Sequence, residues 1–123
     1  MGIVEVVQGT TPDIVLNVPG HDLTGKTVEV YIASGYCRMM LTNDRLGISF
    51  AEGVSVVAFQ LTQRETLKMP VGQYDIQIRY IGPDGWVPAS RMGAAKISVL
   101  PLAVAVPYRR SIDWLNSLRT PVA

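Results

Sequence analysis

The clearest pattern in the chain is a strict alternation of apolar and polar residues after Gly72. A period of two residues is typical of a β-strand that has one buried face and one solvated face. The sequence therefore predicts a strand whose apolar side chains face a core and whose polar side chains face solvent. The apolar set is Tyr74, Ile76, Ile78 and Tyr80, and the polar set is Gln73, Asp75, Gln77 and Arg79.

A capping box precedes this strand. Thr62 and Glu65 are three residues apart, so the Thr hydroxyl and the Glu carboxylate can each accept a backbone N–H that a short helical turn leaves unpaired. The pattern predicts one capped turn between a strand that ends near Leu61 and the strand that begins after Gly72. The segment Gly72-Gln73-Tyr74 also resembles the tyrosine corner of immunoglobulin-like domains, in which a Tyr hydroxyl hydrogen-bonds back across such a turn.

Further short strand patterns follow one another closely, separated by residues typical of turns. This spacing predicts an all-β sandwich rather than βαβ units, with seven or eight strands in a single domain over residues 1–100. We expect the chain to change sheets or turn an edge at residues 8–12, and we expect a hairpin around residues 42–45. The predicted strands, besides the one after Gly72, are Ile3–Val7, Asp13–Val18, Thr27–Ala33, Cys37–Leu41, Leu46–Phe50, Val54–Leu61, Trp86–Met92 and Ala94–Leu100.

The alternation also predicts which side chains form the core. The segment from Val54 to Leu61 is almost wholly apolar, so it is either buried on both faces or paired with a neighbour. The predicted core consists of Val28, Val30, Ile32, Val56, Phe59, Leu61, Tyr74, Ile76, Ile78, Tyr80, Ile97 and Val99.

The last 23 residues, 101–123, form a C-terminal arm of different character. Pro101 and Pro107 each restrict the preceding residue to extended conformations. Ser111 can then cap a short amphipathic helix over residues 112–118. Such an arm either reaches a neighbouring subunit or folds back over its own sandwich, and the sequence leaves both open. The apolar stripe of the predicted helix is Ile112, Trp114, Leu115 and Leu118.

Composition and charge disfavour some classes of function. The chain has 123 residues, is 48% hydrophobic, and carries eleven basic and ten acidic residues for a formal net charge of +1. A dispersed and nearly balanced charge disfavours binding to nucleic acid or to an anionic membrane. No apolar run is long enough to span a bilayer, and the N-terminus has no secretory signal pattern, so we expect synthesis in a host cytoplasm.

The sequence offers few residues that could form a catalytic or metal site. His21 is the only histidine and Cys37 the only cysteine, which together cannot build a closed zinc site. We expect His21 to be a solvated loop residue and Cys37 a buried apolar thiol. The acidic residues are dispersed, and Asp22, Asp44 and Asp84 are expected to serve turns. We therefore expect no enzyme activity, no cofactor, no metal and no small-molecule substrate.

Aromatic residues are the candidates for recognition, since buried aromatic side chains dominate interface energetics. Trp86 follows a tight turn at residues 83–85, and Trp114 lies on the predicted helix. For Trp86 the alternative is packing at the edge of its own sheet. The predicted interface residues are Trp86, Tyr108, Ile112, Trp114, Leu115 and Leu118.

Several motifs together resemble the N-terminal immunoglobulin-like domain of phage baseplate upper proteins, and related domains of phage or prophage tail and head-fibre proteins. The resemblance covers residues 1–100. Its motifs are Gln8-Gly9-Thr10, Asp22-Leu23-Thr24-Gly25-Lys26-Thr27-Val28, Leu61-Thr62 with Thr66, Gly72-Gln73-Tyr74 and Asp84-Gly85.

This resemblance implies an immunoglobulin-like antiparallel β-sandwich in a non-enzymatic virion component that contacts other virion proteins and copies of itself. Since only a short arm follows the sandwich, an adaptor, joining or decoration role in the tail, baseplate or head is expected. We expect the protein to assemble through its sheet edges and its C-terminal arm. The alternative is an immunoglobulin-like adhesion or carbohydrate-binding module.

Overall fold

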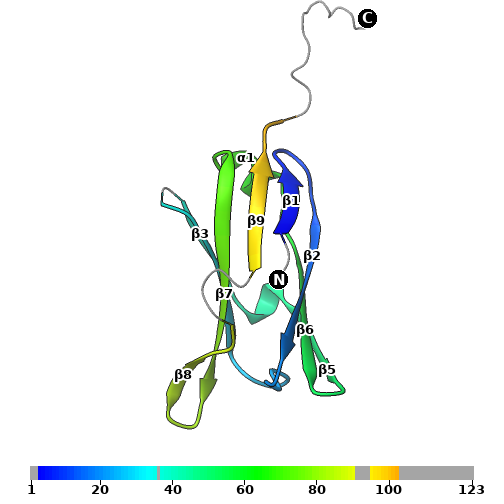
Figure 1. Cartoon of the computed structure of the whole chain (residues 1–123), viewed down its shortest axis with the longest axis vertical. Coiled ribbons are helices and arrows are strands. Elements are labelled where there is room, and N and C mark those ends of the chain that lie inside the picture. The colour runs from blue at the N-terminus through cyan, green and yellow to red at the C-terminus, as the bar shows by residue number, and fades with distance from the viewer. Residues whose placement is uncertain (1–2, 36, 91–94, 103–123) are drawn as a thin grey trace, which may run out of the picture.

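The fold consists of two β-sheets that face each other (Figure 1). The computed structural model describes residues 3–35, 37–90 and 95–102. One sheet has six strands, in the order β1-β9-β7-β3-β4 with β8 also paired to β7, and the other has the order β2-β6-β5. The strands are β1 (Ile3–Val7), β2 (Asp13–Pro19), β3 (Val28–Ala33), β4 (Arg38–Leu41), β5 (Gly47–Ala51), β6 (Val54–Gln60), β7 (Gly72–Gly82), β8 (Gly85–Pro88) and β9 (Ala95–Leu100).

All neighbouring strands pair antiparallel except β1, which runs parallel to β9 at one edge of the larger sheet. β1 and β2 belong to different sheets, so the chain changes sheets at residues 8–12, as predicted. β9 and β8 both pair with β7, but along different stretches. The long strand β7 therefore continues past β9 and forms, with β8, the hairpin at the lower end of Figure 1.

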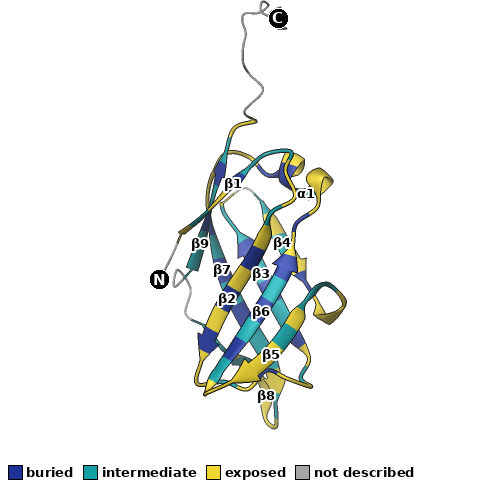
Figure 2. Ribbon diagram, turned by 90° about the vertical axis from the view of Figure 1, so that its right-hand side faces the viewer, coloured by how far each residue is buried: buried dark blue, intermediate teal, exposed yellow. Residues whose placement is uncertain are grey.

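The core lies between the two sheets. Alternate residues of β2, β3, β6, β7 and β9 are buried, which produces the striped strands of Figure 2. The predicted core is confirmed except at two positions, Val56 and Tyr80. The fully or almost fully buried members of the prediction are Val28, Val30, Ile32, Phe59, Leu61, Tyr74, Ile76, Ile78, Ile97 and Val99.

The prediction for Val56 is wrong. In β6 the buried positions are Ser55, Val57 and Phe59, so Val56 points to the outer face. Because nearly every residue of this strand is apolar, the period of two does not distinguish its two faces.

Tyr80 does pack against the core, but it is only partly buried. Its hydroxyl forms a hydrogen bond of 3.0 Å with Nδ1 of His21, which is therefore half-buried rather than solvated.

The predicted hairpin around residues 42–45 is also wrong. β4 belongs to the six-stranded sheet and β5 to the three-stranded sheet, and a short 3₁₀ helix η1 (Asn43–Arg45) joins them. Asn43 fixes this crossing: its side chain accepts a hydrogen bond from Val28 N and donates one to Lys26 O. These contacts come from a distant part of the chain, which turn propensities do not record.

The predicted strand at residues 86–92 ends early, at Pro88. The backbone N–H of Ala89 still donates to Ile78 O at 2.8 Å, but the return bond of this pair goes to a side chain. The hydroxyl of Ser90 instead accepts the N–H of Ile78, at 3.0 Å, in place of a backbone carbonyl. The described residues contain nine strands, one for each predicted segment, rather than the seven or eight expected in total.

The capping box is confirmed. Thr62 Oγ1 accepts from Glu65 N at 3.1 Å, and Glu65 Oε1 accepts from Thr62 N at 2.8 Å, at the start of helix α1 (Gln63–Lys68). The hydroxyl of Tyr74 donates to Pro70 O at 2.7 Å, which is the predicted bond across the corner. These local bonds fix the entry of the chain into β7, the strand that carries most of the outer-face chemistry described below.

Several predictions fall on residues beyond the described ranges. The helix expected at residues 112–118, and with it Tyr108, Ile112, Trp114, Leu115 and Leu118, lies outside the part of the chain that the structure describes.

Cys37 is half-buried and packs against the core rather than being enclosed in it. In the described ranges no helix is long and apolar enough to cross a membrane.

Candidate functional site

The outer face of the six-stranded sheet carries a connected cluster of polar and aromatic side chains. Arg79 of β7 lies opposite Glu29 of β3 in the sheet register, and its Nε donates to Glu29 Oε1 at 2.9 Å. Arg79 Nη2 also donates to the hydroxyl of Tyr31 at 2.8 Å, and that hydroxyl donates to Glu29 Oε1 at 2.7 Å. Each of the three groups therefore holds the other two in place.

Two aromatic rings contact the same guanidinium. The Cζ atom of Arg79 lies 4.1 Å from the ring centroid of Trp86 and 5.1 Å from that of Tyr31. Both are cation–π distances. Trp86 is 42% exposed, so its ring packs on its own sheet and still presents surface to solvent. We call Glu29, Tyr31, Arg79 and Trp86 the Arg79 cluster.

The charges within the Arg79 cluster stabilise one another. The hydrogen bond from Tyr31 lowers the pKa of Glu29, and the ion pair with Arg79 lowers it further. The Glu29 carboxylate in turn raises the pKa of the Tyr31 hydroxyl, and it raises the pKa of Arg79. At neutral pH the cluster therefore holds a carboxylate, a neutral phenol and a guanidinium.

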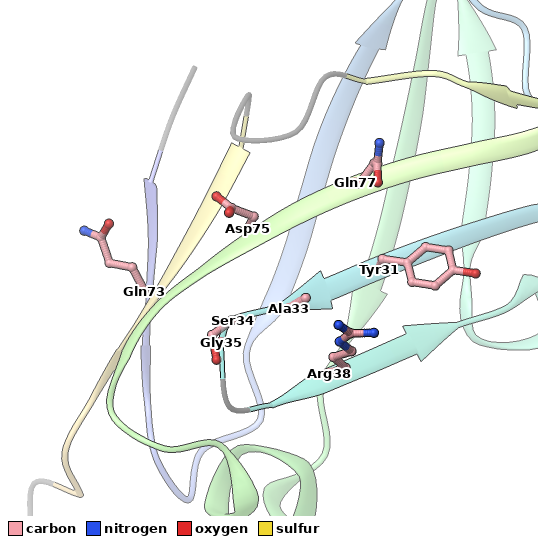
Figure 3. A pocket seen from close by; sticks show the side chains of 8 residues that line it. All are labelled: Tyr31, Ala33, Ser34, Gly35, Arg38, Gln73, Asp75 and Gln77. Carbon is pink, nitrogen blue, oxygen red and sulfur yellow. The ribbon is translucent and has the colours of Figure 1, made fainter.

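Beside this cluster the outer face is hollowed. The depression has a volume of about 500 Å³ and is open to solvent. Figure 3 shows residues of β3 and β4 on one side and residues of β7 on the other. The residues that line it are Tyr31, Ala33, Ser34, Gly35, Arg38, Gln73, Asp75 and Gln77.

The hollow exists because a small residue stands between two larger charged residues. Ala33 of β3 pairs with Arg38 of β4 on one side and with Asp75 of β7 on the other. Asp75 lies next to Lys96 of β9, whose Nζ donates to Asp75 Oδ1 at 3.1 Å. Across the described strands, Arg38 forms no ion pair. A guanidinium and a carboxylate thus border the hollow without contacting each other.

The outer face of the three-stranded sheet has the opposite character. Asp13, at the start of β2, is the one charged residue within these three fully described strands. Val15 is 58% exposed there and pairs with Ala58, and Val56 lies between Asn17 and Ser49. We call this surface the uncharged face; its residues are Val15, Asn17, Pro19, Gly47, Ser49, Ala51, Val54, Val56 and Ala58.

Solvated faces of antiparallel sheets usually carry polar residues at alternate positions. The uncharged face departs from this pattern. Val54, Val56 and Ala58 are all partly buried by their neighbours, and the edge strands β2 and β5 each have one unpaired side. The face is therefore poor in charge, and Val15 is its exposed large apolar side chain.

Of the predicted interface residues, the structure describes only Trp86, and it places that residue in the Arg79 cluster. The alternation after Gly72 put Asp75, Gln77 and Arg79 on the outer face, as found. The sequence analysis did not identify Ala33 and Arg38 as site residues, whereas Tyr31 was among the aromatic candidates for recognition. No signal in the sequence points to them as a group, because they meet only through the register of β3 against β4 and β7.

Asp22 and Asp44 accept hydrogen bonds within their own turns. Asp22 Oδ1 accepts from the backbone N–H of Thr24 at 3.0 Å, and Asp44 Oδ1 accepts from the hydroxyl of Thr42 at 2.5 Å. Within residues 3–35, 37–90 and 95–102, no three His, Cys, Asp or Glu side chains come together in a way that could hold a metal ion.

No protein-family model matches this chain, and no curated protein matches it significantly.

Proposed function

We propose that this chain is a non-enzymatic structural protein of a phage virion, a tail, baseplate or head decoration or joining component that assembles with copies of itself and with other virion proteins. The observation that carries the proposal is the uncharged face, together with the outer edges of β2 and β5, which pair with no other strand of the described residues. A soluble monomer keeps such surfaces small or charged, because exposed apolar sheet surface and unpaired strand edges promote association. We infer that neighbouring subunits cover this surface in the particle.

The immunoglobulin-like identity of the sandwich is part of the same proposal. The strand order β2-β6-β5 against β9-β7-β3-β4 is the arrangement expected of strands B, E and D against G, F, C and C′ of such a domain. The bond from the Tyr74 hydroxyl to Pro70 O corresponds to the tyrosine corner. Both features support the resemblance to phage immunoglobulin-like domains, for which a virion role is implied.

The absence of a covalent link between the sheets fits a protein made in a reducing cytoplasm. Cys37 is a free thiol, so the sandwich relies on packing alone. We propose that the chain is made in the bacterial host and that its final location is the virion.

Sedimentation velocity over a range of concentrations, on the full chain, tests the assembly part of the proposal. We expect the wild-type protein to form oligomers and Val15→Lys to shift it toward monomer, because a buried, unpaired ammonium is costly at an interface. Val71→Lys is the matched control, since Val71 is 55% exposed against 58% for Val15 but lies outside the uncharged face.

A chain that stays monomeric at every concentration would contradict this assembly, as would oligomers that Val15→Lys leaves intact. Equal dissociation of the Val15→Lys and Val71→Lys variants would also contradict it, because the effect would then not belong to the uncharged face.

A further inference from the structure

The hollow beside the Arg79 cluster is large enough for a small ligand. Its volume of about 500 Å³ lies within the range of roughly 300–1,000 Å³ that is typical of small-molecule sites. The polar side chains of Arg38, Gln73, Asp75 and Gln77 border it, and the aromatic ring of Tyr31 stands at one end (Figure 3). We propose that this hollow binds a neutral saccharide.

The placement of the charges selects the ligand class. Arg38 and Asp75 occupy the two strands that flank Ala33, so their Cα atoms are separated by about two strand spacings, roughly 10 Å. An anion drawn to Arg38 would face the Asp75 carboxylate across the hollow, and a cation would compete with Lys96, whose Nζ already pairs with Asp75 Oδ1 at 3.1 Å. A hydroxyl group accepts from the guanidinium and donates to the carboxylate. A ring that bears several hydroxyls satisfies both sides of the hollow at once.

The amide side chains complete this set. Gln73 and Gln77 lie on the same face of β7 as Asp75, two residues on either side of it. Each amide offers a donor and an acceptor, which suits adjacent hydroxyls that must do both. The hollow is open and polar, so it lacks the enclosed apolar walls that a purely hydrophobic ligand requires.

The aromatic end of the hollow is held rigid. The Tyr31 hydroxyl is bonded to Glu29 and Arg79, and Arg79 stacks against both Tyr31 and Trp86. A side chain that is already fixed loses little rotamer freedom when a ligand arrives, which favours binding. The electron-rich face of an aromatic ring attracts the positively polarised C–H groups of a sugar ring. This inference is independent of the virion role, since it uses only the opposite sheet from the uncharged face.

The experiment is an NMR titration of the full ¹⁵N-labelled chain with neutral disaccharides, namely maltose, lactose, cellobiose and chitobiose, guided by a glycan array that also carries acidic glycans. We expect one or more neutral glycans to shift the amide signals of Ala33 and Gln77 in a saturable way. Removing one charged hydrogen-bond donor should weaken that binding about tenfold to a hundredfold in Arg38→Ala.

Two further variants keep the result interpretable. Ala33→Phe fills the floor of the hollow without removing a polar group, and it should also abolish binding. Arg64→Ala is the matched control, because Arg64 is an exposed arginine on α1 and does not line the hollow. It should bind like the wild type, and unfolding midpoints of all variants verify that each is folded.

Four results would overturn the inference. They are no binding at millimolar glycan, binding of acidic glycans alone, wild-type affinity in Arg38→Ala or in Ala33→Phe, and shifts produced by a free zwitterion such as glycine but not by any sugar.

Discussion

Arg45 and Glu65 form a bidentate ion pair that joins η1 to the start of α1. Nη2 of Arg45 lies 2.8 Å from Glu65 Oε1, and Nη1 lies 2.9 Å from Oε2. Arg45 Nη2 also donates to Gln60 O at 3.0 Å, at the end of β6. The same carboxylate therefore caps a helix and fastens the segment in which the chain crosses between the sheets.

This relationship predicts a pH dependence of stability. The hydrogen bonds from Arg45, and then the backbone N–H of Thr62, lower the pKa of Glu65 from 4.5 to about 2. Because the folded state holds the lower pKa, the stabilisation is complete above about pH 4.5 and is lost as the pH falls toward 2. With allowance for solvent around the pair, the loss amounts to about 1–2 kcal/mol.

Glu65→Gln isolates this effect, because the amide oxygen can still accept from Thr62 N. Urea unfolding at a series of pH values should show the wild type losing its advantage over Glu65→Gln between pH 4.5 and 2. A constant difference between the two proteins across that range would contradict the role of the carboxylate charge.

The facing of β6 gives a second prediction. Val57 is fully buried, whereas Val56 points to the uncharged face. Val57→Ala should lower the free energy of unfolding by about 2 kcal/mol, and Val56→Ala by much less, because only the first leaves a cavity in the core. Denaturant midpoints of the two variants compare them directly. Equal losses would show that the register of β6 is wrong.

A third prediction concerns Thr66, which is fully buried in α1. Its hydroxyl accepts from Gly9 N at 3.0 Å and donates to Thr10 O at 2.8 Å, and it thereby ties α1 to the loop between β1 and β2. Thr66→Val keeps the shape but leaves both backbone groups unpaired, at a cost of about 1–3 kcal/mol. Thr66→Ser keeps the hydroxyl and should retain these two bonds. Similar unfolding midpoints for the Thr66→Val and Thr66→Ser variants would show that the hydroxyl does not stabilise the fold.

The sequence predicted what local patterns decide. The alternation in β7 gave the correct facing of that strand because polar and apolar residues differ clearly on its two sides. The capping box and the Tyr74 bond were predictable because both lie within a few residues of chain.

Contacts between distant segments decided the rest. Asn43 bonds to Lys26 and Val28, and Arg45 bonds to Glu65, so the loop after β4 crosses to the other sheet instead of forming a hairpin. The hollow depends on Ala33 pairing with both Arg38 and Asp75, and that register is set by three strands together. Local turn and strand preferences contain no information about such pairings.

A fourth prediction separates the arm from the fold. β9 ends at Leu100, and the backbone N–H of Leu102 donates to Gln8 Oε1 at 3.3 Å, so every described strand lies before residue 103. Deleting residues 103–123 should leave a folded domain with an unchanged unfolding midpoint that assembles less well than the full chain. Circular dichroism and sedimentation measure the two properties separately. A truncated protein that unfolds, or that assembles as well as the full chain, would contradict an assembly role for the arm.

The virion proposal is tested most directly by quantitative mass spectrometry of phage particles purified from the strain that encodes this chain. We expect the chain to be present in a fixed number of copies per particle and to stay bound through a high-salt wash, because an interface built on the uncharged face does not depend on exposed ion pairs. Particles that are complete and infectious but lack the chain would contradict the proposed function.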